Sequence, residues 1–224
     1  MWYYFFMSWL DALFLGILQG ITEFLPISSS GHLVLAEHYL GLNTQGLGSF
    51  DILLHMGTLL ALLIYFKEEV WGMFKAFARL VGGKFDKGDE STRLIFLLII
   101  GTIPAVIFGL LWNEKLDKIF RTLDITAILM IATGIVFMLG ELCYSEITNK
   151  GIWAKIKNFL RIGGSGGGTN MEEITWLQSL IIGIAQAIAI IPAISRSGAT
   201  IVAGIFQGIN RSSAAKFSFL LSIP

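Results

Sequence analysis

The sequence predicts an all-α integral membrane protein, built as an inverted-topology repeat with two re-entrant helical hairpins. Three observations predict this class. Of the 224 residues, 54% are hydrophobic and only 14% are charged, whereas a soluble domain carries about a quarter charged residues. Apolar segments of membrane-spanning length alternate with short charged loops. A polar motif inside one apolar stretch recurs later in the chain.

Composition also argues against several other classes. The net charge is zero, so no basic surplus supports a nucleic-acid partner. The single cysteine, Cys143, cannot form an intrachain disulfide, and we expect it to be inert. The N-terminal MWYYFFMSWL lacks the basic region and cleavage site of a signal peptide. Its aromatic residues are typical of an interfacial anchor.

The first re-entrant hairpin is expected at about residues 10–42. Its apolar first half contains Gln19 and Glu23 and ends at Pro26, and a serine-glycine turn leads to a second short apolar piece. Neither piece has the roughly 20 apolar residues that a crossing needs. A turn at membrane depth is tolerated only where it lines a cavity or is buried in protein.

Three crossings follow, and then a second hairpin. The segments are expected as spans at about 50–66, 94–112 and 125–142, a surface amphipathic helix at 70–81, a second hairpin at about 177–209 and an incomplete span from about 214. The chain thus divides into a first repeat (1–142), a cytoplasmic flexible loop (143–176) and the start of a second repeat (177–224). The loop's glycine-rich run at 163–168 is a flexible linker by composition, natural or engineered. The apolar C-terminus predicts a C-terminally truncated chain, with about six transmembrane helices at full length.

Basic residues predict the orientation. Residues 1–66 contain no Lys or Arg, while the stretch 67–93 contains six and the stretch 143–175 contains four. The positive-inside rule places both basic stretches in the cytoplasm and the N-terminus outside. Because three crossings separate the hairpins, the first would enter from outside and the second from inside.

A fixed offset of 167 residues aligns the two hairpins without a gap. Gln19 meets Gln186, Ser28 meets Ser195, and the same offset aligns Ile17, Ile21, Ser30, Gly31, Phe50, Leu53 and Leu54 with Ile184, Ile188, Ser197, Gly198, Phe217, Leu220 and Leu221. An odd number of crossings between the copies makes the repeat inverted. Such folds place the site near the membrane midplane, where the broken helices meet.

The first loop offers carboxylate, hydroxyl and imidazole groups. Gln19 and Glu23 share one helix face, and their oxygens suit a hard cation such as magnesium. Glu23 is alternatively a general base or a packing contact between helices. Ser28, Ser30 and Gly31 stand at a helix start, which favours a bound anion or a plain N-cap. Ser29 with His32 as its base is a candidate nucleophile.

The second loop replaces Ser29 by Arg196. A guanidinium fits phosphate oxygens bidentately, and pairing with Glu23 is the structural alternative. Further donors to the same anion are Ser195, Ser197, Gly198 and Thr200. We expect His55, Glu37 and His38 to be polar contacts between helices or rim residues.

These groups suit phosphoryl transfer from a membrane-borne phosphate or pyrophosphate. A polyprenyl-phosphate transporter or flippase is the alternative, because inverted hairpins are also a transporter device. A histidine-nucleophile lipid phosphatase needs a later histidine where Val202 stands, and none follows His55. A purely structural scaffold would leave Glu23, His32 and Arg196 without a purpose.

Two motifs resemble the signatures of a known family. QGITEFLPISSSGHL (19–33) and IPAISRSGATIV (191–202) are similar to those of the undecaprenyl-pyrophosphate phosphatases, and the resemblance includes FDILLHMGTLLA and KFSFLLSIP. It implies a multi-pass enzyme of the bacterial inner membrane that hydrolyses undecaprenyl pyrophosphate. The product is the carrier lipid for peptidoglycan synthesis, and the activity implies bacitracin resistance. The resemblance also implies a divalent cation, usually magnesium, with calcium as the alternative.

The family's site residues carry over by motif. Gln19 and Glu23 match the two acidic positions of its E/Q-xxx-E motif, and glutamine at the first removes one carboxylate. The matches to its Ser-Ser-x-Gly-His and Ser-Arg-Ser-x-x-Thr elements are Ser28, Ser29, His32, Ser195, Arg196, Ser197 and Thr200. Ala193 stands where many members have glycine. The resemblance does not decide whether the nucleophile is a serine, His32 or water. We expect the site to open to the outer side of the membrane. A homodimer is a possible assembly.

Overall fold

The computed structural model describes residues 7–42, 47–83, 88–120, 122–148 and 168–224. Within these ranges the regular structure is helical, and the one β-type interaction is an isolated bridge between Thr169 and Ile209. The predicted all-α class is therefore confirmed. Part of the predicted N-terminal anchor and most of the glycine-rich run lie outside the described residues, as does the side chain of Cys143.

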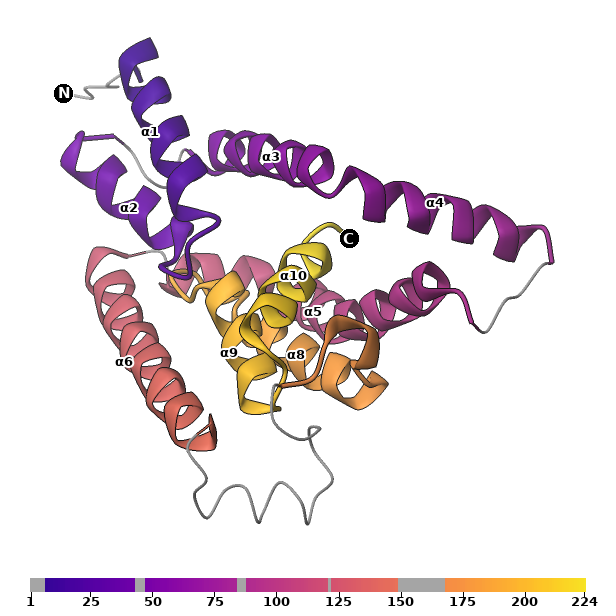
Figure 1. Cartoon of the computed structure of the whole chain (residues 1–224). Coiled ribbons are helices and arrows are strands. Elements are labelled where there is room, and N and C mark those ends of the chain that lie inside the picture. Colours follow the sequence, from indigo (N-terminus) through magenta and orange to yellow (C-terminus); the bar gives the residue numbers. More distant parts are fainter. Residues whose placement is uncertain (1–6, 43–46, 84–87, 121, 149–167) are drawn as a thin grey trace.

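Figure 1 shows the order of the elements along the chain. They are α1 (Trp9–Thr22), α2 (Ser29–Tyr39), α3 (Gly48–Tyr65), α4 (Lys67–Val81), α5 (Glu90–Phe120), α6 (Leu123–Thr148), the 3-10 turn η2 (Met171–Glu173), α8 (Trp176–Ile188), α9 (Arg196–Phe206) and α10 (Arg211–Leu221). Helix α6 continues six residues beyond the predicted span at 125–142, so the predicted loop from 143 begins as helix. Its apolar sequence does not end at a breaker, which explains the continuation.

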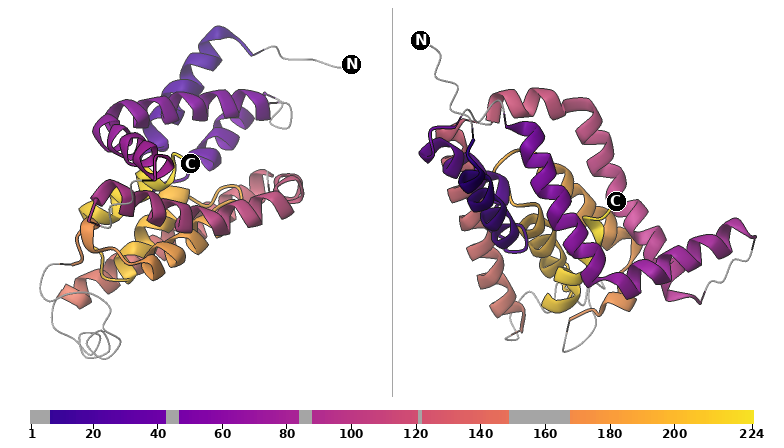
Figure 2. Two further views of the ribbon diagram at one scale, coloured as in Figure 1. Left: turned by 90° about the vertical axis from the view of Figure 1, so that its right-hand side faces the viewer. Right: turned by 90° about the horizontal axis from the view of Figure 1, so that it is seen from above.

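Two groups of helices form the molecule. Helix α8 packs on α5, α9 packs on α8 and α10, and α6 lies beside both α2 and α9. The segment α1–α4 lies across this bundle, with α4 extending outward from α3 (Figures 1 and 2). The two short-helix pairs, α1–α2 and α8–α9, thus come from opposite ends of the chain and face one another.

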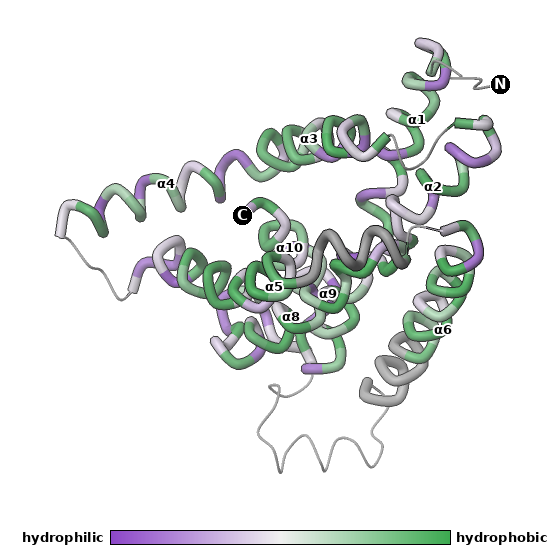
Figure 3. The backbone as a smooth tube through the Cα atoms, turned by 180° about the vertical axis from the view of Figure 1, so that it is seen from behind, coloured by the Kyte–Doolittle hydropathy of each residue, from purple (hydrophilic) through white to green (hydrophobic). Residues whose placement is uncertain are grey.

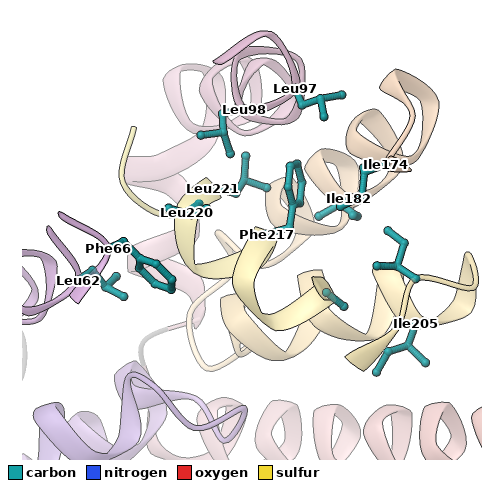
Figure 4. Packing of buried hydrophobic residues seen from close by; sticks show 12 residues of the cluster. Leu62, Phe66, Leu97, Leu98, Ile174, Ile182, Ile205, Phe217, Leu220 and Leu221 are labelled. Carbon is teal, nitrogen blue, oxygen red and sulfur yellow. The ribbon is translucent and has the colours of Figure 1, made fainter. Parts of the chain in front are cut away.

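Two hydrophobic clusters hold the helices together. The larger cluster joins α3, α5, α8, α9 and α10 and is built around Phe217, Leu220 and Leu221, which are essentially inaccessible (Figure 4). The smaller cluster joins α1 to α2 through Leu15, Leu33 and Leu42. The smaller cluster also packs against Phe50 and Leu54 of α3, so α3 takes part in both clusters.

The outer helix faces are apolar. Helix α3 and residues Glu90–Leu111 of α5 are long and apolar enough to cross a membrane, and the apolar part of α6, Leu123–Leu139, is shorter. Hydrophobic residues cover these helices, while polar residues gather on α4 and at helix ends (Figure 3). Together with the composition, these faces indicate a membrane protein.

Local structure recurs at the offset of 167 residues. Ser8 and Thr175 each form a capping box at the start of α1 and α8, with Asp11 and Gln178 as the returning side chains. Ser28 and Ser195 cap α2 and α9, and these helices both begin at the following residue. Beyond them, Gly41 and Gly208 both adopt a positive φ. The inverted membrane topology itself stays a prediction.

Candidate active site

A cavity of about 650 Å³ lies where the two serine-containing loops meet α3. Its wall is formed by Thr22, Glu23, Ser28, Ser29, Ser30, Leu33, Val34, Gly48, Asp51, Ile52, His55, Met56, Thr58, Leu59, Leu62, Ala189, Ile190, Ile191, Pro192, Ile194, Ser195, Arg196, Ser197 and Ser222. Helix α3 contributes both polar and apolar residues to this wall, and the second loop adds an apolar run from Ala189 to Pro192. The cavity therefore combines a polar end around Glu23 with apolar wall segments from α3 and the second loop.

Glu23 is the centre of the polar end. It caps the C-terminus of α1, and only 9% of its side chain is exposed. Its Oε1 accepts a hydrogen bond from Arg196 Nη2 at 2.6 Å. Its Oε2 accepts from Ser29 Oγ at 2.5 Å and from Gln19 Nε2 at 3.1 Å. A buried charge requires both a counter-charge and hydrogen bonds. Glu23 finds them on both loops, so its carboxylate links the first loop to the second.

Arg196 is held in a fixed direction. Its Nη2 binds Glu23, and its Nη1 donates to the carbonyl oxygen of Ser222 at 3.3 Å. The side chain remains 36% exposed at the cavity wall. The planar guanidinium is consequently oriented by two partners and accessible from the cavity.

Each loop ends in a serine cap. Ser28 Oγ accepts from the N–H of Gly31 at 3.2 Å, and Ser195 Oγ accepts from the N–H of Gly198 at 3.1 Å. Since both caps line the cavity, the N-termini of α2 and α9 open onto it. The positive ends of the two helix dipoles there favour an anion.

The two loops are also tied to each other. Ser30 Oγ accepts a hydrogen bond from the N–H of Ala193 at 3.3 Å, and Ser197 Oγ donates to the carbonyl oxygen of Leu25 at 3.4 Å. Ser30 and Ser197 are equivalent under the 167-residue offset. Each reaches across to the backbone of the opposite loop, so together they hold the two helix starts at one place.

His55 lines the cavity whereas His32 does not, and the catalytic role of His32 stays a prediction. His32 Nδ1 bonds to the carbonyl oxygen of Ser28 at 2.8 Å, and His32 does not line the cavity. His55 does line it, with Nε2 at 3.7 Å from Glu23 Oε2. His38 is exposed and Glu37 is buried away from the cavity.

The sequence repeat relates His55 to a residue of the second half of the chain. The offset of 167 residues pairs His55 with Ser222. Both residues line the cavity, and the carbonyl oxygen of Ser222 accepts from Arg196. Extending the repeat into α3 therefore leads to His55.

Comparison with known proteins identifies the family. A family model described as bacitracin resistance protein BacA matches residues 12–224. The chain belongs to the BacA family. An undecaprenyl-diphosphatase of Idiomarina loihiensis is 40% identical over 218 residues, which cover 97% of this chain and 73% of the relative. Undecaprenyl-diphosphatase 1 of Pseudoalteromonas translucida is 39% identical with the same coverage, and an undecaprenyl-diphosphatase of Desulforapulum autotrophicum is 38% identical over 94% of this chain and 71% of its own.

Three of the residues predicted to bind substrate lie away from the cavity in this BacA-family chain. Gly31 and Gly198 face α6, where a Cβ on Gly31 would come within 2.6 Å of Met130 Sδ and one on Gly198 would collide with the Phe137 ring. Thr200 is buried and hydrogen-bonded to Ser218 at 2.5 Å. Their roles in binding stay predictions. The structure shows them supporting the packing of α9 and α2.

The predicted cation ligands are adjacent. Gln19 is 1% exposed, and its Oε1 has no hydrogen-bond partner while its Nε2 donates to Glu23. Across the described residues, no three His, Cys, Asp or Glu side chains gather closely enough to form a metal cluster. Magnesium takes one or two protein oxygens and completes its shell with water and substrate phosphate. Gln19 does not line the cavity, so the magnesium site stays a prediction.

Proposed function

We propose that this chain hydrolyses undecaprenyl pyrophosphate to undecaprenyl phosphate and inorganic phosphate in the cavity between its two serine loops. The observation that carries the proposal is the Glu23 carboxylate, which binds the Ser29 hydroxyl through one oxygen and the Arg196 guanidinium through the other. A base (Glu23), a hydroxyl nucleophile (Ser29) and a guanidinium that can bind phosphate (Arg196) thus lie in contact with one another. The identity of the substrate is inferred from membership of the BacA family and from relatives that are named undecaprenyl-diphosphatases.

Ser29 is the nucleophile in this proposal. Its Oγ attacks the terminal phosphorus, its proton passes to Glu23 Oε2, and the bond from phosphorus to the bridging oxygen breaks. Undecaprenyl phosphate leaves with that proton on its departing oxygen, which restores the Glu23 carboxylate. The serine carries the phosphoryl group until water removes it. The short Ser29–Glu23 hydrogen bond supports serine over His32, whose ring lies outside the cavity wall.

Arg196 changes partner when substrate binds. In the substrate-free chain it neutralises Glu23. A terminal phosphate offers the same fork-shaped guanidinium two oxygens and more charge. Transfer of Arg196 to the phosphate frees the carboxylate to act as a base at the moment when substrate is in place, while the N-termini of α2 and α9 supply further positive potential.

Magnesium, with calcium as the alternative, belongs to the same proposal. Glu23 and the unpartnered Oε1 of Gln19 would hold it. When bound, the ion would neutralise charge on the pyrophosphate.

The membrane arrangement is the third part of the proposal. The pairs α1–α2 and α8–α9 are re-entrant hairpins of an inverted repeat in the bacterial inner membrane, with the N-terminus outside and the site opening to the outer side. The equivalent caps at 8 and 175, and at 28 and 195, support the repeat. Hydrolysis there regenerates the carrier lipid for peptidoglycan synthesis and would confer bacitracin resistance.

The test is phosphate release from undecaprenyl pyrophosphate by the purified protein in detergent. Release should require magnesium, stop with a chelator, and fall to background in Ser29→Ala. Ser8→Ala is the control for replacing a serine by alanine, because it removes a helix cap far from the cavity and should leave phosphate release intact. Tight binding of the lipid pyrophosphate without release would overturn the enzyme proposal in favour of a carrier.

A further inference from the structure

His55 occupies the cavity in a defined tautomer. Its Nδ1 lies 2.7 Å from the carbonyl oxygen of Asp51, one turn earlier in α3. A carbonyl oxygen can only accept, so the ring hydrogen is on Nδ1. In the neutral ring, Nε2 therefore presents a lone pair, and it is this nitrogen that faces Glu23.

The spacing between His55 and Glu23 is too wide for a direct hydrogen bond. Nε2 and Oε2 are 3.7 Å apart, beyond the normal N···O range. Both atoms are acceptors, so a small donor such as water can bridge them with one hydrogen to each. His55 is 42% exposed at the cavity wall, so the position is accessible.

The two carboxylate oxygens of Glu23 have different partners. Arg196 occupies Oε1, whereas Ser29, Gln19 and His55 approach Oε2. Once Ser29 is phosphorylated and its proton has left with undecaprenyl phosphate, Oε2 no longer accepts a hydrogen bond from Ser29. The pair of acceptors formed by Oε2 and His55 Nε2 then stands beside the phosphoserine.

We propose that His55, together with Glu23, positions the water that hydrolyses the phosphoserine. The inference rests on the proposed function. The water oxygen forms the new bond to phosphorus, and the bond from phosphorus to Ser29 Oγ breaks. One water hydrogen passes through Glu23 Oε2 to Ser29 Oγ. The other, held by His55, leaves with the phosphate, so atoms and charge balance.

The test separates the two half-reactions with terminally 32P-labelled undecaprenyl pyrophosphate. His55→Ala should retain the first-turnover burst of undecaprenyl phosphate, while steady-state phosphate release falls about tenfold, as expected for one lost hydrogen bond at the transition state. Acid quenching should trap labelled phosphoserine on the variant. His55→Gln, which keeps an acceptor near the Nε2 position, should restore release to within about threefold.

His38→Ala is the matched control, because His38 is exposed and its ring contacts Tyr39 rather than the cavity. It should match the parent in burst and release, and thermal unfolding should show that His55→Ala remains folded. Unchanged release in His55→Ala, an equal loss of burst and steady state, or no rescue by His55→Gln would each overturn the inference. A parent protein without phosphate release would instead overturn the proposed function.

Discussion

The two serine loops share a capping pattern but differ in backbone conformation and in chemistry, since φ is +67° at Ser28 and −68° at Ser195. Ser28 and Ser195 cap their helices with similar bonds, and Ser28–Ser30 and Ser195–Ser197 have nearly equal hydroxyl separations of 3.4 and 3.3 Å. The first loop carries Ser29 where the second carries Arg196, and Glu23 corresponds to Ile190. A repeated scaffold can thus hold an asymmetrical site. In the proposed mechanism, one loop supplies the base and the nucleophile, and the other supplies the guanidinium of Arg196.

Removing the charge of Glu23 should break this division of roles most severely. Glu23→Gln keeps the shape but removes the base and the partner of Arg196, so we expect turnover to fall about a thousandfold. Phosphate release with and without magnesium measures the effect. Glu69→Gln, in a surface pair with Lys216, is the matched control. Near-parental, magnesium-dependent turnover in Glu23→Gln would move both base and metal site elsewhere.

Arg196→Lys tests the second loop. Lysine keeps the charge but cannot bind Glu23 and the Ser222 carbonyl with one planar fork. We expect kcat/KM to fall about a hundredfold, the order found when a preorganised donor is removed from a charged transition state. Arg79→Lys, whose parent arginine pairs with Asp89 outside the site, should be nearly silent. Equal kinetics in Arg196→Lys would refute the clamp.

Alanine substitutions at the two equivalent glycines, Gly31 and Gly198, compare how tightly α2 and α9 pack against α6. Gly198→Ala forces a methyl group into the Phe137 ring, and we expect a loss of about 1–3 kcal/mol in stability. Gly31→Ala meets the flexible Met130 side chain, which can move aside, so the loss should be smaller. Thermal unfolding in detergent measures both. Equal losses would show that α6 does not distinguish the two helices.

Ala193→Gly should have the smallest effect, and it should be favourable. Ala193 has φ of +70°, a left-handed conformation that costs a non-glycine residue about 1–2 kcal/mol. Glycine removes this strain but gains freedom in the unfolded chain, so we expect a net stabilisation of about 1 kcal/mol or less. The same unfolding assay measures it. A destabilised Ala193→Gly would show that the loop relaxes the strain by another route.

The starts of the short helices could be predicted from the sequence, because they depend on residues that are close together along the chain. The short helices, their serine caps and the break at Pro26 follow from apolar periodicity and capping chemistry. The helix starts at Ser29 and Arg196 agree with those signals. Helix ends were less predictable, since α6 runs on to Thr148 without a local breaker.

Residue types and their spacing were sufficient to predict a membrane-embedded, helical, phosphate-handling protein, because burial of carboxylate, hydroxyl and guanidinium groups in apolar sequence is costly without a use. The sequence predicted the pair between Glu23 and Arg196 as one of two alternatives, and the fold confirms it across 173 positions. Only the fold showed that His55, rather than His32, lies at the cavity wall. It also turned Gly31 and Gly198 towards α6. These choices depend on how α3 and α6 pack against the two hairpins, and such contacts leave no pattern in either hairpin's own sequence.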